Sequence, residues 1–184
     1  MFQGEILEVS WNTLLEEMDL EAVPFSDDVL LYLDARSIHV GEPQVSSVDL
    51  SKVVGTTHPD YCGKTWGQLK PVPGTSEGDF INNRDVAFQG LKRAVGNIQC
   101  LERNPEYYFS DEEKDHWSFY QIGDEYYISS GNNRTVIGRL FLHLNGQKEV
   151  VHGVVVTPAE YKTEPEVEPE RIGLISRLMA WFRT

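Results

Sequence analysis

A strand-like run at residues 126–130 breaks at the turn 131–134, Gly-Asn-Asn-Arg, and restarts as a helix. This order constrains the fold more than any other stretch of the chain. The first turn of a helix leaves backbone N–H groups unpaired, and with the positive end of the helix dipole they attract an anion. Arg134 would add a planar fork of donors that matches phosphate oxygens. Alternatively, the asparagines only cap the helix and the arginine points into solvent. The pattern predicts a strand, a turn and a helix, and leaves both interpretations of the turn open.

The neighbouring segments supply the rest of a small sheet. Residues 117–122 and 125–129 are rich in aromatic residues and flank Gly123-Asp124, which predicts a short hairpin. A helix is expected from 135 to 144, and the valine-rich stretch 150–157 is expected to be a buried strand. Together these elements predict an α+β fold in which a small mixed sheet packs with helices.

The segment between the N-terminal part and the hairpin gives weaker signals. Gly, Pro, Ser and Thr are frequent from 41 to 78, so this stretch is expected to be mostly loop, with one strand at 45–54. Residues 85–96 have an apolar stripe at helical spacing and end in Gly96, which predicts a helix that stops at that glycine.

The N-terminal part, residues 1–40, is strongly acidic. An amphipathic helix is expected at 5–22 and a strand at 29–33, both packed on the core. Residues 1–35 hold nine acidic residues and no Lys or Arg, in a chain whose net charge is -13. Such a chain is a poor generic DNA binder. The charge also suggests a second function of another class: a non-catalytic acidic interaction protein, such as an antitoxin, immunity or phage-related factor, that captures a basic protein partner.

The hairpin, the turn, the helix and the valine-rich strand, residues 117–157, resemble the core of the ParB/sulfiredoxin superfamily. In that superfamily a strand ends in a Gly-x-x-Arg turn that opens a helix, and a further strand follows. The resemblance implies a ParB/sulfiredoxin-like domain over 41–158 whose turn binds nucleotide or nucleic-acid phosphate. The resemblance allows a nucleotide with Mg²⁺ as the cofactor, and it leaves open whether phosphodiester or nucleotide hydrolysis takes place. The phosphate-binding residues so implied are Gly131, Asn132, Asn133, Arg134 and Thr135, with the N–H groups of Thr135 and Val136.

Two departures from the superfamily remove its best-known chemistries. Sulfiredoxins place a reactive cysteine directly after the glycine, where this chain has Asn132, and without a thiol sulfinic acid reduction is excluded at this site. ParB partition proteins carry a further Asn-Arg motif and a helix-turn-helix after this core, whereas here Thr157 leads into an acidic segment. The resemblance therefore implies a stand-alone ParB-like domain whose ligand is open.

Other candidate sites are less specific. Asn83 and Arg84 precede the expected helix 85–96 and form a candidate second phosphate contact, although helix capping explains them more simply. The acidic cluster at 111–116 could hold a divalent cation, but a solvated surface is the favoured interpretation. Neither cysteine has a CxxC partner and no Cys/His group has zinc spacing, so no metal site is predicted.

The C-terminal part changes composition again. Residues 159–170 are rich in Glu and Pro, which predicts a stiff, charged linker. It leads into 171–184, which is expected to be a basic amphipathic helix. Packing on its own chain or a subunit is the favoured interpretation, a protein partner ranks second and a membrane surface third. No run approaches the roughly 18 apolar residues of a membrane span, and no signal peptide is evident, so a cytoplasmic protein is expected.

Overall fold

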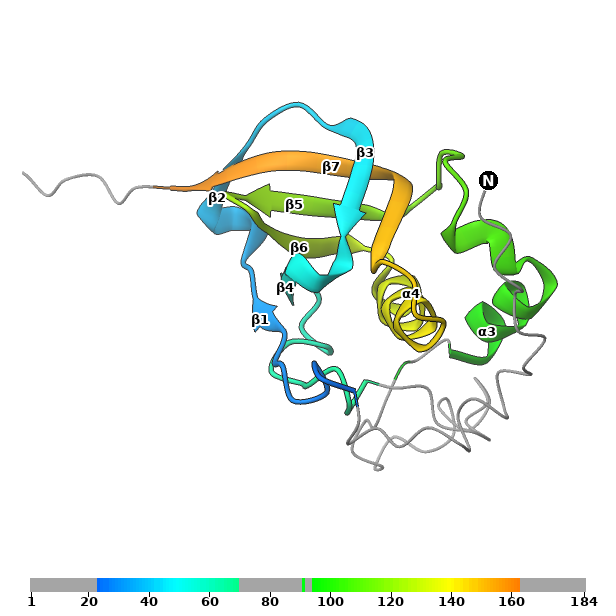
Figure 1. Ribbon diagram of the computed structural model, residues 1–184. Coiled ribbons are helices and arrows are strands. Elements are labelled where there is room, and N and C mark those ends of the chain that lie inside the picture. The colour runs from blue at the N-terminus through cyan, green and yellow to red at the C-terminus, as the bar shows by residue number, and fades with distance from the viewer. Residues whose placement is uncertain (1–22, 70–90, 92–93, 163–184) are drawn as a thin grey trace, which may run out of the picture.

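The computed structural model describes residues 23–69, 91 and 94–162, which form a small α+β fold around one mixed sheet (Figure 1). The expected fold class, a small mixed sheet with helices, is confirmed. The strands are β1 (Leu31–Tyr32), β2 (Ile38–Val40), β3 (Gln44–Asp49), β4 (Val53–Thr56), β5 (Ser118–Ile122), β6 (Glu125–Ser130) and β7 (Val150–Tyr161). The helices are α3 (Ala94–Arg103) and α4 (Asn132–Leu144), with 3-10 turns at Ala35–Ser37, Leu50–Lys52 and Pro105–Tyr108.

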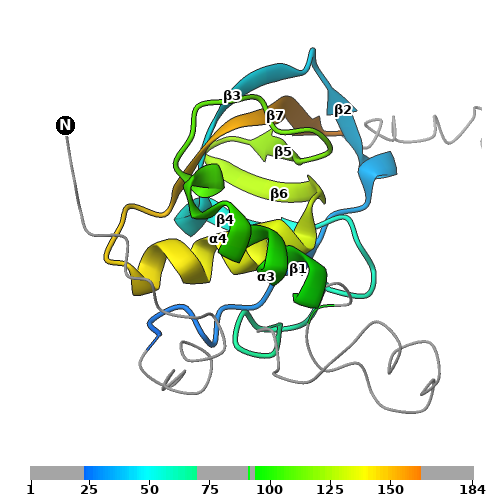
Figure 2. The ribbon, with the colours of Figure 1, turned by 90° about the vertical axis from the view of Figure 1, so that its right-hand side faces the viewer.

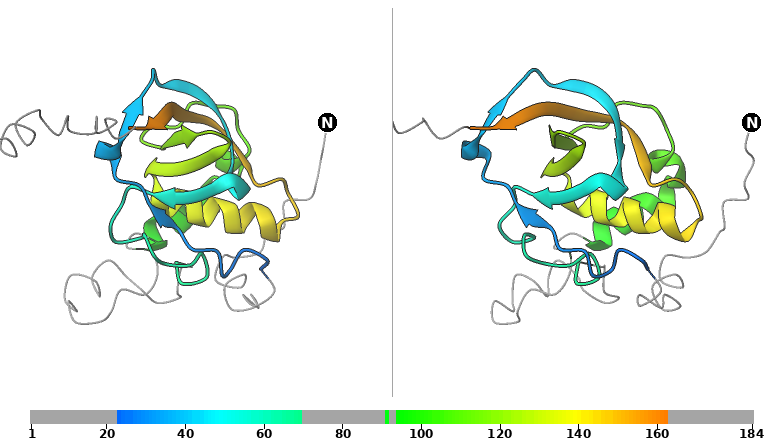
Figure 3. Two further views of the ribbon diagram at one scale, coloured as in Figure 1. Left: turned by 90° about the vertical axis from the view of Figure 1, so that its left-hand side faces the viewer. Right: turned by 60° about the vertical axis from the view of Figure 1, so that its left-hand side comes forward.

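The sheet brings together strands that are far apart in the sequence. Its order is β1-β4-β6-β5-β7-β2, and β3 also pairs with β7. β1, β4 and β6 are parallel, with Thr56 opposite Ile128 in the β4–β6 pair, while β5 is antiparallel to β6 and parallel to β7. Figures 2 and 3 show the sheet curled over α4, with α3 beside that helix. Because β4 and β6 are parallel neighbours, their carboxyl ends reach the same edge of the sheet.

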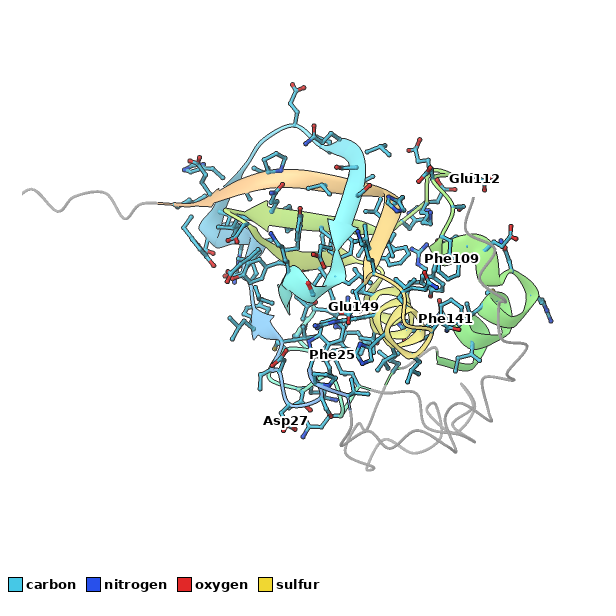
Figure 4. All side chains as sticks on the ribbon, viewed as in Figure 1. Phe25, Asp27, Phe109, Glu112, Phe141 and Glu149 are labelled. Atoms are coloured by element: carbon cyan, nitrogen blue, oxygen red, sulfur yellow. The ribbon has the colours of Figure 1, made fainter. Side chains whose placement is uncertain are left out.

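The core lies between the sheet and α4. Its buried side chains come from both layers and include two tryptophans, so burial of apolar area is the main stabilising contribution. They include Leu30, Val48, Leu50, Trp66, Trp117, Phe119, Ile128, Val136, Ile137, Leu140, Val151 and Val154. The rings of Phe109 and Phe141, 5.7 Å apart between centroids, join the segment after the third 3-10 turn to α4 (Figure 4).

A buried cation joins α4 to two distant segments. The guanidinium carbon of Arg139 lies 3.8 Å from the ring centroid of Phe25 and 4.4 Å from that of Trp66. Its Nε donates to Oε2 of Glu149 at 2.7 Å, and Oε1 of that carboxylate lies 3.0 Å from Nδ1 of His143. Figure 4 shows Phe25 and Glu149 beside α4. These five residues, the Arg139 cluster, fasten the start of the described chain and the loop that carries Trp66 to the helix.

Gly138 is required inside α4 by the close approach of Tyr108. A Cβ at position 138 would lie 2.5 Å from Cε1 of the Tyr108 ring. Helix propensity alone would make Gly138→Ala stabilising by up to about 1 kcal/mol. Overpacking opposes this gain and typically costs about 1–3 kcal/mol. We therefore expect Gly138→Ala to lower the free energy of unfolding by about 1–2 kcal/mol in urea denaturation.

The cause of this loss can be checked in a second background. If the Tyr108 ring is responsible, Gly138→Ala should cost much less when combined with Tyr108→Leu, since residues in contact are not additive. A Gly138→Ala protein that is more stable than the wild type would contradict the packing described for this position.

Several expected elements are found with different bounds. The hairpin is confirmed as β5 and β6. α4 begins at Asn132 rather than at 135, because Gly131, with φ 88°, is the residue that precedes the helix, and the asparagines lie in its first turn. β7 continues to Tyr161, because Ala159 to Tyr161 pair with β2. The first residues of the expected linker 159–170 therefore belong to the sheet.

The strand expected at 45–54 is two strands, β3 and β4. The 3-10 turn Leu50–Lys52 separates them, and the carboxylate of Asp49 caps it by accepting the N–H of Ser51 at 3.0 Å. The strand expected at 29–33 is shorter, since β1 spans only Leu31–Tyr32.

The predicted end of the helix 85–96 at Gly96 is wrong. α3 runs through Gly96 to Arg103. A glycine inside a helix costs about 1 kcal/mol, and burial of Ile98 and Leu101 on the following turn offsets this cost. The helix expected at 5–22 and most of the one expected at 85–96 lie outside the described residues.

Candidate functional site

The turn 131–134 lies at the edge of the sheet where β4 and β6 end. In open sheets with parallel strands, ligands bind beyond the carboxyl ends of those strands. A cavity of about 560 Å³ lies here, which we call the β4–β6 cavity. Its lining comes from the segment after β4, the end of β6, the start of α4 and two further segments. These residues are His58, Tyr61, Asn97, His116, Ser129, Ser130, Gly131, Asn132, Asn133 and Arg134.

Gly131 has a structural reason to be glycine. Its φ is 88°, a left-handed conformation that L side chains rarely adopt. A Cβ at this position would also lie 2.6 Å from Cδ1 of Trp117, a fully buried side chain. The glycine therefore allows the chain to turn sharply over the indole, whether or not a ligand is bound.

Asn132 is the most informative residue of the cavity. It is 8 % exposed, and its Oδ1 accepts a hydrogen bond from Oγ1 of Thr56 at 2.8 Å. Thr56 Oγ1 in turn accepts the backbone N–H of His58 at 3.0 Å. Among the described residues, the Nδ2 group of Asn132 has no hydrogen-bond acceptor. A buried amide without its acceptor is costly, so this donor group points to a ligand.

Thr135 supports the turn and does not line the cavity. Its Oγ1 accepts the indole N–H of Trp117 at 2.9 Å and donates to the carbonyl oxygen of Gly131 at 3.0 Å. Its backbone N–H donates to the same carbonyl at 2.9 Å. The sequence predicted that this N–H would face an anion, whereas the helix already uses it.

Arg134 is tied to the protein by three hydrogen bonds. Its Nη1 donates to the hydroxyl of Tyr107 at 2.9 Å and to the carbonyl oxygen of Asp115 at 2.8 Å, and its Nη2 donates to the carbonyl oxygen of His116. The guanidinium carbon lies 5.4 Å from the ring centroid of Trp117. An arginine has five N–H donors, so Nε and one N–H of Nη2 have no acceptor among the described residues. Arg134 therefore links backbone segments at the rim of the cavity, and only part of its guanidinium group could contact a ligand.

The acidic run before the hairpin surrounds a buried cation. Lys114 is 2 % exposed, and its Nζ donates to the carbonyl oxygens of Ser110, Glu112 and His152 at 2.7, 3.1 and 2.8 Å. Burial lowers the pKa of this ammonium, while the carboxylates of Asp111 and Glu112 oppose the shift. Within the described part of the chain, no group of three or more His, Cys, Asp or Glu side chains could hold a metal ion.

Of the remaining predicted contacts, one lies at the cavity and the others fall outside the described residues. Asn133 lines the cavity, whereas Asn83 and Arg84 lie outside the described residues. The acidic segment 1–22 and the helix expected at 171–184 also lie outside them. No α-helix of the described ranges is long and apolar enough to cross a membrane.

The histidines of the cavity are not indicated by the sequence pattern. His58 lies in the stretch 41–78 that is expected to be mostly loop, and its only signal is its position two residues after β4 (Val53–Thr56). His116 was assigned to the acidic cluster, but its carbonyl oxygen accepts from Arg134.

Comparison with known proteins leaves the family of the chain open. No protein-family model matches the sequence, and neither curated proteins nor solved structures give a significant match.

Proposed function

We propose that the β4–β6 cavity binds a phosphate group of a nucleotide or nucleic acid. The observation that carries the proposal is Asn132, a buried residue in the first turn of α4 whose Nδ2 group lacks an acceptor among the described residues. The N-terminus of a 13-residue helix adds unpaired N–H groups and a positive partial charge.

The chemistry of the lining supports an anionic ligand. Among the described residues, the side chains that line the cavity include one arginine, two histidines and two serines, and no carboxylate. The remaining donors of Arg134 and the hydroxyl of Ser129 suit phosphate oxygens, whereas the hydroxyl of Ser130 already donates to the carbonyl oxygen of His116 at 2.8 Å. The resemblance of residues 117–157 to the ParB/sulfiredoxin superfamily points to the same ligand class. The proposal is limited to binding, and hydrolysis stays a prediction.

Asn132→Asp is the variant that tests this proposal most directly. The carboxylate keeps an oxygen for the Thr56 hydroxyl and replaces the Nδ2 donors by a negative charge. Thermal unfolding would be followed with pyrophosphate, CTP, ATP and GTP, each with and without Mg²⁺. A ligand at a hundred times its Kd should stabilise the wild type by about 2.7 kcal/mol. We expect Asn132→Asp to weaken binding by about tenfold or more.

The matched control is Gln147→Glu, the same change of charge on an exposed residue beyond the other end of α4. It should leave ligand-induced stabilisation unchanged. The proposal is wrong if none of these phosphates stabilises the wild type, or if Asn132→Asp responds to them as the wild type does.

A further inference from the structure

His58 is placed opposite the start of α4 in the same cavity. It is the second residue after β4, just as Asn132 is the second residue after β6, and β4 and β6 are parallel neighbours. Two hydrogen bonds connect them: the His58 N–H donates to Thr56 Oγ1 at 3.0 Å, and that hydroxyl donates to Asn132 Oδ1 at 2.8 Å. These hydrogen bonds therefore fix the position of His58 relative to Asn132.

The imidazole of His58 is held in one tautomer. Its Nδ1 accepts the backbone N–H of Asp60 at 3.2 Å, so in the neutral ring the proton is carried by Nε2. The ring of Tyr61 packs against the imidazole, with 4.7 Å between ring centroids, and Tyr61 itself is buried. Within the described ranges, Nε2 has no hydrogen-bond partner. His58 thus carries an N–H donor at Nε2 on a side chain that lines the same cavity as Asn132.

Donors from both strand ends suit a terminal phosphate better than an internal one. A phosphodiester has two free oxygens and one negative charge, whereas a terminal phosphate has three free oxygens and a charge of about -1.5 to -2 near neutral pH. The first turn of α4, Asn132 and Arg134 supply donors from the β6 side, enough for two oxygens. A donor from the β4 side fits a third oxygen.

We infer that His58 is the residue that makes the β4–β6 cavity select a terminal phosphate over an internal phosphodiester. The inference rests on the proposed function, because it assumes that the cavity binds phosphate. It assigns the ligand to the class of mononucleotides and phosphorylated nucleic-acid ends, and it makes His58 a specificity-determining residue.

The test compares two versions of one four-nucleotide single-stranded DNA, with and without a 5′-phosphate, each labelled at its 3′ end. Both carry the same internal phosphodiesters. Binding to the full chain would be measured by fluorescence anisotropy, and pyrophosphate would serve as an unlabelled competitor. Hydrogen bonds to a charged phosphate are stronger than those to neutral groups. We therefore expect the wild type to bind the phosphorylated strand about tenfold more tightly than the unphosphorylated one.

Two substitutions separate the donor of His58 from its structural role. In His58→Asn the side-chain oxygen stands near the position of Nδ1 and can still accept the Asp60 N–H, but the donor at Nε2 is lost. In His58→Gln the amide can place a donor near the position of Nε2. We expect the preference for the phosphorylated strand to fall to about onefold to threefold in His58→Asn and to be largely kept in His58→Gln. The control His39→Asn, at an exposed position of β2, should keep it fully.

The outcomes distinguish this inference from the proposed function. If His58→Asn keeps the tenfold preference while Asn132→Asp loses binding, the cavity binds phosphate and the role of His58 is overturned. If His58→Asn and His58→Gln lose the preference equally, the donor at Nε2 is not what selects the ligand. If neither strand nor pyrophosphate binds the wild type, both the function and the inference are wrong.

Discussion

Arg139→Met is expected to destabilise the protein by about 3–5 kcal/mol, the usual cost of removing one partner of a buried ion pair. The substitution keeps most of the side-chain volume but leaves the carboxylate of Glu149, whose side chain is 16 % exposed, without its strongest partner. It also removes the cation between the rings of Phe25 and Trp66. Urea denaturation followed by tryptophan fluorescence would measure the loss, and Trp66 would report it directly.

Two further variants show whether the charge is responsible. Arg139→Met combined with Glu149→Gln should recover part of the lost stability, because the unpaired carboxylate is then gone. Arg36→Met removes an arginine whose ion pair with Asp34 is exposed, and it should leave the unfolding midpoint nearly unchanged. A loss that is as small in Arg139→Met as in Arg36→Met would show that the cluster is not a stabilising unit.

Gly131→Ala is expected to cost about 2–6 kcal/mol, from two separate causes. A left-handed backbone conformation costs a non-glycine residue about 1–3 kcal/mol, and φ at this residue is 88°. The added methyl group would also lie 2.6 Å from Cδ1 of Trp117. This side chain cannot easily move away, because it is fully buried and its indole N–H donates a hydrogen bond to Thr135. Overpacking of this kind adds about 1–3 kcal/mol.

Gly123→Ala is the matched control for the backbone part. Gly123 has φ 64°, and a Cβ there would meet no atom within 4 Å, so only the conformational cost applies. Thermal and urea unfolding of the two variants should therefore show a clearly larger loss for Gly131→Ala. Equal losses would mean that the Trp117 contact relaxes freely, and the steric part of the argument would fail.

The fold was predictable where the pattern was local. The hairpin and α4 follow from alternating aromatic residues, a Gly-Asp turn and a helical apolar stripe, all within about 30 consecutive residues. The break between β3 and β4 was not predictable in this way, because Leu50 is as apolar as its strand neighbours and only the Asp49 cap stops the strand. α3 passes through Gly96 because burial of Ile98 and Leu101 outweighs propensity.

Only the part of the candidate site at the start of α4 was predictable from the sequence. Residues 131–134 could be proposed from their order, since a glycine before a helix and an arginine in its first turn are local signals. His58 and Thr56 reach Asn132 only because β4 pairs with β6 in parallel, across more than 70 residues of chain. Likewise, Arg134 is held by carbonyls of Asp115 and His116, and backbone acceptors carry no sequence signature.

The packing of Gly131 against Trp117 changes how related sequences should be compared. Selection for a stable fold alone would keep the glycine in any relative that retains the buried indole, so its invariance would not indicate a retained ligand. Positions 132 and 58 carry that information instead. If the cavity binds phosphate as proposed, a relative with Asp at 132 and without a side-chain donor at 58 is expected to keep the architecture and lose that binding, and it would identify lineages in which the domain has taken another role.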